Sequence, residues 1–220
     1  MRKIYLCIIA FLSVSTSIFG RDGVYIEFKI TSGSMTGSSR SYSAGGDTRS
    51  EMNFNAAAGI SIATLMLHDA PGKVYMINER DKTYSEMSAG QSQGENSERD
   101  DYDVTVVGNE RINNFNSVHV KVKNKRTQKV TDMWLSKDIV NYSSYTGVKS
   151  KYLGGSGFFS KLKEKGADGF VVRMIANGDR GENMQMDLVK AEKRDVPASM
   201  LSLDGYTKSA GAGMPGGYSA

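Results

Sequence analysis

The sequence predicts a mainly β protein of the α+β class, folded as one domain with a single short helix. Val24–Ile30 and Val118–Lys123 alternate apolar and polar residues strictly, which is the period of a strand with one buried face and one solvent face. Glycine, asparagine and aspartate separate such runs and favour tight turns. At 220 residues, with 39% hydrophobic and 24% charged residues, the chain is long enough to bury a core.

The first twenty residues have the pattern of a secretory signal peptide. Arg2 and Lys3 precede the apolar run Ile4–Val14, and the small residue Gly20 precedes the expected cleavage site. The apolar run is too short to anchor the chain across a bilayer. We therefore expect residues 1–20 to be removed and the mature chain to be periplasmic or secreted.

Cysteine usage and charge limit the possible functions of the mature chain. The only cysteine, Cys7, lies inside the expected signal peptide and not at its cleavage site, so we expect neither a disulfide nor a lipid anchor. Without Arg2 and Lys3, 26 basic residues face 24 acidic ones. This near-neutral balance gives no indication of nucleic-acid binding.

Further strands are predicted along the chain. Turn residues such as Gly45-Gly46, Gly108-Asn109 and Asn113-Asn114 separate them, and Ser32–Ser39 and Ser88–Asp101 have the composition of loops. The predicted strands are Arg40–Ala44, Asp47–Phe54, Ile60–His68, Lys73–Asn78, Thr83–Met87, Asp103–Val107, Lys129–Leu135, Gly169–Ala176 and Met184–Ala191. Val140–Tyr152 has no clear pattern.

The one helix is predicted from Ser156 to about Lys165, with Ser156 as N-cap and Gly166 as its stop. Its spacing places Phe158, Phe159 and Leu162 on one face. A helix this short is marginal alone, so we expect it to dock on the sheet. Residues 209–220 are rich in glycine and alanine and predict a flexible tail, which leaves residues 21–208 as the folded domain.

No pattern in the sequence indicates an enzyme or a cofactor. His68 and His119 are the only histidines, and we interpret them as rim or surface residues and not as a metal or catalytic pair. Ser156 lacks the spacing of a nucleophile elbow, so helix capping explains it better. One cluster is acidic, comprising Glu98, Asp100, Asp101 and Asp103, and it lacks the spacing of a calcium-binding loop. Another cluster is basic and fits the polar face of a strand with its turn; it comprises Lys121, Lys123, Lys125, Arg126 and Lys129.

Methionine is the one residue type in excess, with 12 in the chain. Methionine is flexible and polarizable, so it suits surfaces that accept varied apolar partners as well as ordinary cores. Val74–Ile77 is apolar on both faces, which requires a layer of protein or ligand over each. Core filling and ligand contact both remain open from these residues alone.

Several short motifs resemble a secreted bacterial family, domain of unknown function 4412, placed near the LolA/LolB lipoprotein carriers. They are Val24–Phe28, Ala70–Met76 with Lys82–Tyr84, Gly108–Phe115, Met133–Ile139, Asp195–Pro197 and Asp204–Tyr206. The resemblance implies a strongly curved antiparallel sheet, a LolA-like half-barrel, with the short helix across its concave side and an apolar cavity between them. Ser117 stands where this family often has a cysteine, so no cysteine-dependent role carries over.

These observations predict a non-enzymatic binding protein for an apolar small molecule or lipid, or for the acyl chains of a lipoprotein. The residues expected to line the cavity are Val74, Met76, Met133, Phe158, Phe159, Leu162 and Met174. The alternative is a structural or interaction protein of the cell envelope that binds a protein partner on its sheet and has no ligand cavity. The sequence leaves the ligand and the oligomeric state open.

Overall fold

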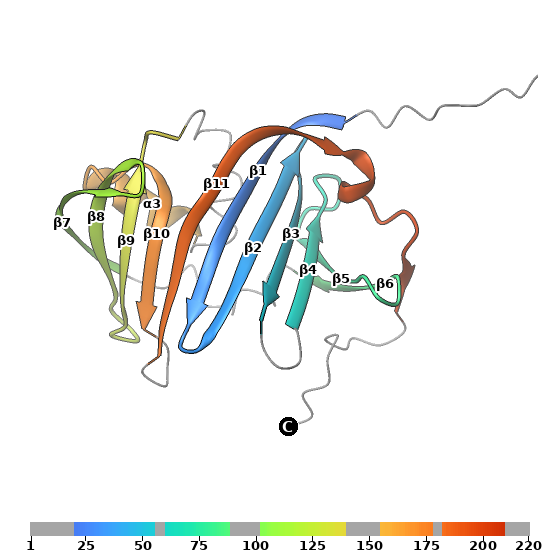
Figure 1. The fold of residues 1–220 in the computed structure, drawn as a ribbon, viewed down its shortest axis with the longest axis horizontal. Coiled ribbons are helices and arrows are strands. Elements are labelled where there is room, and N and C mark those ends of the chain that lie inside the picture. Colours follow the sequence, from blue (N-terminus) through green and yellow to red (C-terminus); the bar gives the residue numbers. More distant parts are fainter. Residues whose placement is uncertain (1–19, 56–59, 89–101, 140–154, 178–181, 210–220) are drawn as a thin grey trace, which may run out of the picture.

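A computed structural model describes residues 20–55, 60–88, 102–139, 155–177 and 182–209. In this part of the chain twelve strands form one curved sheet, in the order β12-β6-β5-β4-β3-β2-β1-β11-β10-β9-β8-β7 (Figure 1). Neighbouring strands are antiparallel, except that β12 runs parallel to β6. The mainly β class and the curved antiparallel sheet predicted from the sequence are confirmed.

Each predicted strand and the predicted helix has a counterpart in the structure, but β1, β2, β7 and β11 are five to seven residues longer than predicted, and η2 and β12 were not predicted. The bounds of the elements are β1 Gly20–Ser32, β2 Met35–Ala44, β3 Asp47–Phe54, β4 Ile60–Met66, β5 Lys73–Asn78, β6 Thr83–Ser88, β7 Tyr102–Ile112, β8 Phe115–Asn124, β9 Val130–Ser136, α3 Gly155–Glu164, β10 Phe170–Asn177, β11 Asn183–Pro197, the short 3-10 helix η2 Ala198–Leu201, and β12 Thr207–Lys208. Of the expected loop Ser88–Asp101, Ser88 ends β6 and the rest lies outside the described residues. Residues 1–19 of the expected signal peptide, the unassigned stretch 140–152 and residues 210–220 of the expected tail also lie outside them.

Two expectations about turns are wrong. Ser32–Ser39 is not a loop, because β1 and β2 meet at a tight turn in which Gly33 has a φ of 55°. Gly108-Asn109 is not a turn either. Strand β7 continues through it, and a register shift between Val106 and Gly108 absorbs the extra residue as a bulge. A glycine inside a strand can mark a bulge as readily as a turn.

The pair β1 and β11 connects the two halves of the sheet. The two strands pair along the whole of β1, from Gly20 opposite Pro197 to Ser32 opposite Met184. Strand β11, 15 residues long, arches beside β1 between β2–β6 on one side and β7–β10 on the other (Figure 1). The long N-terminal strand is therefore held by residues more than 150 positions away in the chain.

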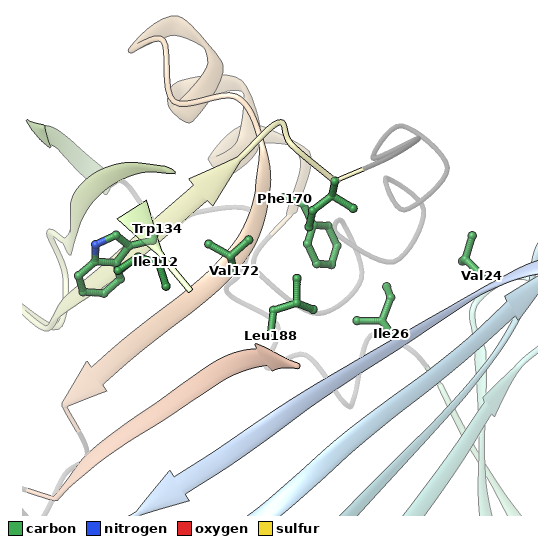
Figure 2. Packing of buried hydrophobic residues seen from close by; sticks show 8 residues of the cluster. Val24, Ile26, Ile112, Trp134, Phe170, Val172 and Leu188 are labelled. Carbon is green, nitrogen blue, oxygen red and sulfur yellow. The ribbon is translucent and has the colours of Figure 1, made fainter. Parts of the chain in front are cut away.

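Strand β10 pairs with β11 only from Arg173 onward, so its first residues diverge from β11. The side chains of Phe170 and Val172 lie in this divergence and pack against Ile26 and Leu188 (Figure 2). The Phe170 ring stacks on Phe28 at a centroid distance of 6.2 Å. This apolar cluster holds the two halves of the sheet together where the backbone ladder opens.

Helix α3 docks on the sheet, as the sequence predicted, and it does so at the β7–β10 end. Leu162, 1% exposed, packs with Val120, Met133 and Val171 in a buried cluster. The helix ends at Glu164 and is stopped by Gly166, whose φ is 75°, and the Ala167 amide donates to the Leu162 carbonyl at 2.9 Å. The predicted glycine stop is therefore confirmed as a Schellman-type ending.

The C-terminal segment covers the opposite face of the sheet at the other end. Leu201 of η2 packs against Leu65, Ile77 and Val196 in a third buried cluster. Leu65 and Ile77 alternate along their strands with Thr64 and Met76, so the two sets point to opposite faces. At this end the described residues cover one face of the sheet and leave the other for the cavity described below.

Candidate ligand cavity

A cavity of about 370 Å³ lies on one face of the sheet. We call this side the cavity face. The lining comes from strands β1, β2, β3, β4, β10 and β11. The lining residues are Ile26, Phe28, Ser39, Ser41, Ser50, Glu51, Met52, Ile62, Thr64, Phe170, Val171, Met174, Met184 and Met186. The volume falls within the range of roughly 300 to 1,000 Å³ that is usual for small-molecule sites.

The register of the sheet explains why one face carries all of these side chains. Residues directly opposite each other in an antiparallel ladder lie on the same face. Ile26 pairs with Ser41, Ser41 with Ser50, and Ser50 with Thr64. The neighbouring row runs from Phe28 through Ser39 and Met52 to Ile62. Both rows cross β1 to β4 and form the floor of the cavity.

Small side chains leave the floor unfilled. Ser39, Ser41, Ser50 and Thr64 stand where large aliphatic residues would otherwise fill the concavity of the sheet. The Ser41 and Ser50 hydroxyls lie 3.0 Å apart and hydrogen bond across the two strands. The cavity therefore results from residue size at central strand positions, combined with the curvature of the sheet.

Methionines form the wall on the β10 and β11 side. Met186 pairs with Met174 on one side and Ile30 on the other, and Met184 stands two residues before Met186 on the same face. None of the lining methionines is fully buried, and unbranched thioether chains can adapt to the shape of an apolar guest. The methionine excess in the sequence thus contributes directly to the lining.

The opposite face of these strands carries charge. Arg49 Nε donates to Glu51 Oε1 at 2.8 Å, and Arg49 also contacts Glu79. Burial alone would raise the pKa of Glu79, but hydrogen bonds from Lys82, Tyr206 and Arg49 lower that pKa to about 2. The carboxylate of Glu51 is held by Arg49, and alternation along β3 directs it away from Ser50 and Met52.

A second charged cluster follows the same face at β1 and β2. The Tyr25 hydroxyl donates to Glu27 at 2.8 Å, and Arg40 pairs with the same carboxylate at 3.3 Å. Burial, helped by the adjacent carboxylate, raises the pKa of Tyr25 to about 12, while the Tyr25 hydrogen bond lowers the pKa of Glu27. Polar and charged pairs thus occupy this face, and the cavity face remains apolar with hydroxyls.

The structure places the sequence-predicted site residues in four kinds of position. Met174 lines the cavity. Met133 and Leu162 are buried together between the sheet and α3. Val74 and Met76 are half-buried, and the pairing of Met76 with Thr64 puts Met76 on the cavity face, outside the described lining.

Phe158 and Phe159 belong to α3, but their side chains lie outside the described residues. The expected position of the cavity was under this helix, and none of the described lining residues comes from α3. A ligand-contacting role for the seven residues stays a prediction.

Most of the lining was not named from the sequence, although some signals were present. Met184 and Met186 alternate with polar residues in the last hairpin, as do Ile26 and Phe28 in the clearest strand. The serines of β2 and β3 carry no such signal, because a serine on a strand is as typical of solvent as of a cavity floor. Only the pairing of distant strands identifies them.

The two histidines do not meet. His68 is exposed, and its Nδ1 lies 2.8 Å from Asp47. His119 is buried, which corrects its interpretation as a rim residue. Its Nδ1 lies 2.9 Å from Glu110 and its Nε2 2.7 Å from Asp132.

The His119 ring also stacks on Trp134, whose indole N–H donates to Glu110 at 3.0 Å. This hydrogen bond, helped by the adjacent His119, lowers the pKa of Glu110. A groove of about 310 Å³ adjoins the cluster, lined by Asn109–Arg111 and Asn116–Val118. Each member has a partner within the cluster, so we interpret it as a structural link between β7, β8 and β9.

Neither a metal centre nor a membrane-spanning helix is found in the part of the chain that the structure describes. No group of three or more histidine, cysteine, aspartate and glutamate side chains there is arranged to hold a metal ion. No helix among the described residues has both the length and the apolar character needed to cross a bilayer.

The fold and the cavity together define a curved-sheet β protein with an apolar pocket on one face. Residues 23–204 match the family described as domain of unknown function DUF4412, and the chain belongs to this family. The membership predicted from the short motifs is thereby confirmed. No curated protein matches the chain.

Several solved structures are similar to the chain in fold. The MucA/MucB complex of Pseudomonas aeruginosa matches at a TM-score of 0.43 and 11% identity, over 84% of this chain and 56% of that one. Lipoprotein LppX of Mycobacterium tuberculosis matches at a TM-score of 0.40 and 9% identity, over 76% of this chain and 85% of LppX. A LolA superfamily protein of Nitrosomonas europaea matches at a TM-score of 0.34 and 12% identity, over 83% of this chain and 90% of that protein. The chain spans little more than half of MucB.

Proposed function

We propose that this protein is a non-enzymatic binding protein of the bacterial cell envelope, periplasmic or secreted, that carries an apolar ligand in the cavity. The ligand would be a lipid or the acyl chain of a lipoprotein. The observation that carries this proposal is the cavity of about 370 Å³ with walls of Met, Ile, Phe and Val. Exposing this apolar surface to water costs free energy, and binding an apolar ligand over it removes that cost.

Desolvation would supply the binding free energy. Each buried methylene contributes about 0.8 kcal/mol, so a long acyl chain can reach micromolar affinity after the costs of association and chain ordering. The lining methionines would adapt to the chain without a fixed shape. No chemical step is required of the protein, because its role would be to shield the ligand from water.

The proposed export is compatible with the position of the expected cleavage site. Cleavage after Gly20 removes only the first residue of β1 and leaves Arg21, whose guanidinium pairs with Asp47 at 2.7 Å. Val24 and Ile26, in the core, lie well beyond the cut. The mature chain would thus retain the contacts that hold β1.

The proposal is tested with protein that has been unfolded, stripped of lipid and refolded. A neutral fluorescent probe such as N-phenyl-1-naphthylamine should bind saturably at one site, and lipid extract should displace it. Met186→Asp places a charge on the cavity wall and should abolish binding. The matched control Asp187→Asn changes the next residue, on the opposite face, and should leave the probe affinity unchanged. Absence of saturable binding to the refolded protein would contradict the proposal.

One observation favours a second function, binding of a protein partner at the sheet edge. Strand β7 is the last strand of the described sheet, and it exposes Val106 and Val107 at 44% and 50%. An edge strand with exposed apolar residues can accept an added strand. The test is crosslinking in the cell envelope with the parent and with Val106→Lys. A protein partner that is recovered with the parent but lost with the variant, while probe binding is unchanged, would support this function.

A further inference from the structure

We infer that the cavity selects a neutral amphiphile, an acyl chain attached to an uncharged ester, amide or hydroxyl group, over an anionic lipid such as a free fatty acid. This inference rests on the proposed function and specifies its ligand class. It follows from the charge and hydrogen-bonding groups of the lining.

The described lining of the cavity directs no charged group inward. Among the fourteen described lining residues, Glu51 alone has an ionisable side chain, and its carboxylate is engaged by Arg49 on the other face of β3. No lysine, arginine or histidine belongs to this described lining. A carboxylate or phosphate brought into the cavity would therefore lose water without gaining a cation, which is strongly unfavourable.

Among the described lining residues, serine and threonine hydroxyls are the hydrogen-bonding side chains directed into the cavity. Ser39 stands between Phe28 and Met52, and Thr64 stands between Ser50 and Met76, across the floor. Neither the Ser39 nor the Thr64 hydroxyl has a hydrogen-bond partner among the described residues, whereas the Ser41 hydroxyl bonds to Ser50. A hydroxyl both donates and accepts, so it complements a carbonyl as well as an alcohol.

The methionine wall and the floor hydroxyls lie on different strands, although Phe28, Met52 and Ile62 share the floor with the hydroxyls. Met174, Met184 and Met186 lie on β10 and β11, while Ser39 and Thr64 lie on β2 and β4. The geometry suits a molecule with its hydrocarbon chain along the methionine wall and its uncharged polar group on the hydroxyl floor. A pure hydrocarbon would leave the hydroxyls without partners, at a cost in affinity.

The test compares ligands with one acyl chain and different polar groups. Monoolein, oleyl alcohol and oleate displace the neutral probe from refolded, lipid-free protein at pH 8, below their aggregation concentrations. We expect oleate to bind at least about tenfold more weakly than monoolein. Oleate binding as tightly as monoolein would overturn the inference while leaving the proposed function intact. Failure of all three ligands and of the probe would remove both.

Two variants test the assigned groups. Ser39→Lys places an ammonium on the floor and should raise the affinity for oleate relative to monoolein, whereas Ser38→Lys, on the opposite face, should not. The double variant Ser39→Ala with Thr64→Val should weaken monoolein about threefold to tenfold and should tighten octadecene, which no longer leaves two hydroxyls without partners. An unchanged preference in the double variant, with a thermal unfolding profile like that of the parent, would refute the role of the hydroxyls.

Discussion

Replacement of Leu162 by alanine tests whether α3 is part of the core or a movable lid. Leu162 is 1% exposed and contacts the sheet through a cluster that includes Val120, Met133 and Leu135. Truncating a fully buried leucine removes its transfer free energy and leaves a cavity, at a cost of about 2 to 5 kcal/mol. A ten-residue helix is marginal alone, so the substitution should also undock α3. We therefore expect the free energy of unfolding to fall by about 3 kcal/mol.

The assay is urea unfolding followed by Trp134 fluorescence and far-ultraviolet circular dichroism. The chain has one tryptophan, and it lies on β9 beside Met133, which contacts the Leu162 cluster. Lys163→Ala is the matched control, because Lys163 is exposed on the same helix and should change stability by less than about 0.5 kcal/mol. Unchanged stability of Leu162→Ala, together with altered probe binding, would refute the core assignment and make α3 a lid.

Three other predictions concern charge, close packing and export. Glu79→Gln should destabilise the protein at pH 7, and the loss of stability relative to the parent should shrink as pH falls from about 4.5 towards 2. The reason is that the lowered pKa of Glu79 stabilises the fold above the unfolded-state pKa, and this stabilisation is lost on protonation. Equal stability differences at pH 7 and pH 2.5 in thermal unfolding would contradict this. Gly169→Ala should destabilise by more than 1 kcal/mol, because its Cβ would meet the Ser136 backbone at 2.8 Å; an unchanged urea midpoint would argue against it. Edman sequencing of the exported protein should begin at Arg21, and an N-terminus at Met1 would rule out cleavage.

Local patterns predicted most of the strands because alternation records which face of each strand is buried. Lys73–Asn78 and Asp47–Phe54 were predicted with the bounds the structure gives. The misplaced turn at Gly108-Asn109 shows the limit of such patterns, because a glycine serves a bulge or a turn and only the partner strand decides.

The cavity was harder to predict than the strands because it depends on pairings between distant segments. Ser41 faces Ile26 and Ser50 only because β1, β2 and β3 are aligned in one particular register. Met174 was named from the methionine excess, but Met186 opposite it was not named, since the β10–β11 register is a property of the fold. The local sequence predicts which residues of a strand share a face, and the tertiary fold determines which of those faces lines the cavity.

The central claim, that the cavity carries a ligand, is tested most directly by native mass spectrometry of the protein purified from its own host. We predict a mature mass plus a discrete lipid mass, which should disappear in Ser41→Phe, where the new ring fills the cavity floor, and persist in Ser38→Phe on the opposite face. A parent protein that carries only its bare mature mass, in preparations never exposed to detergent, would contradict the claim.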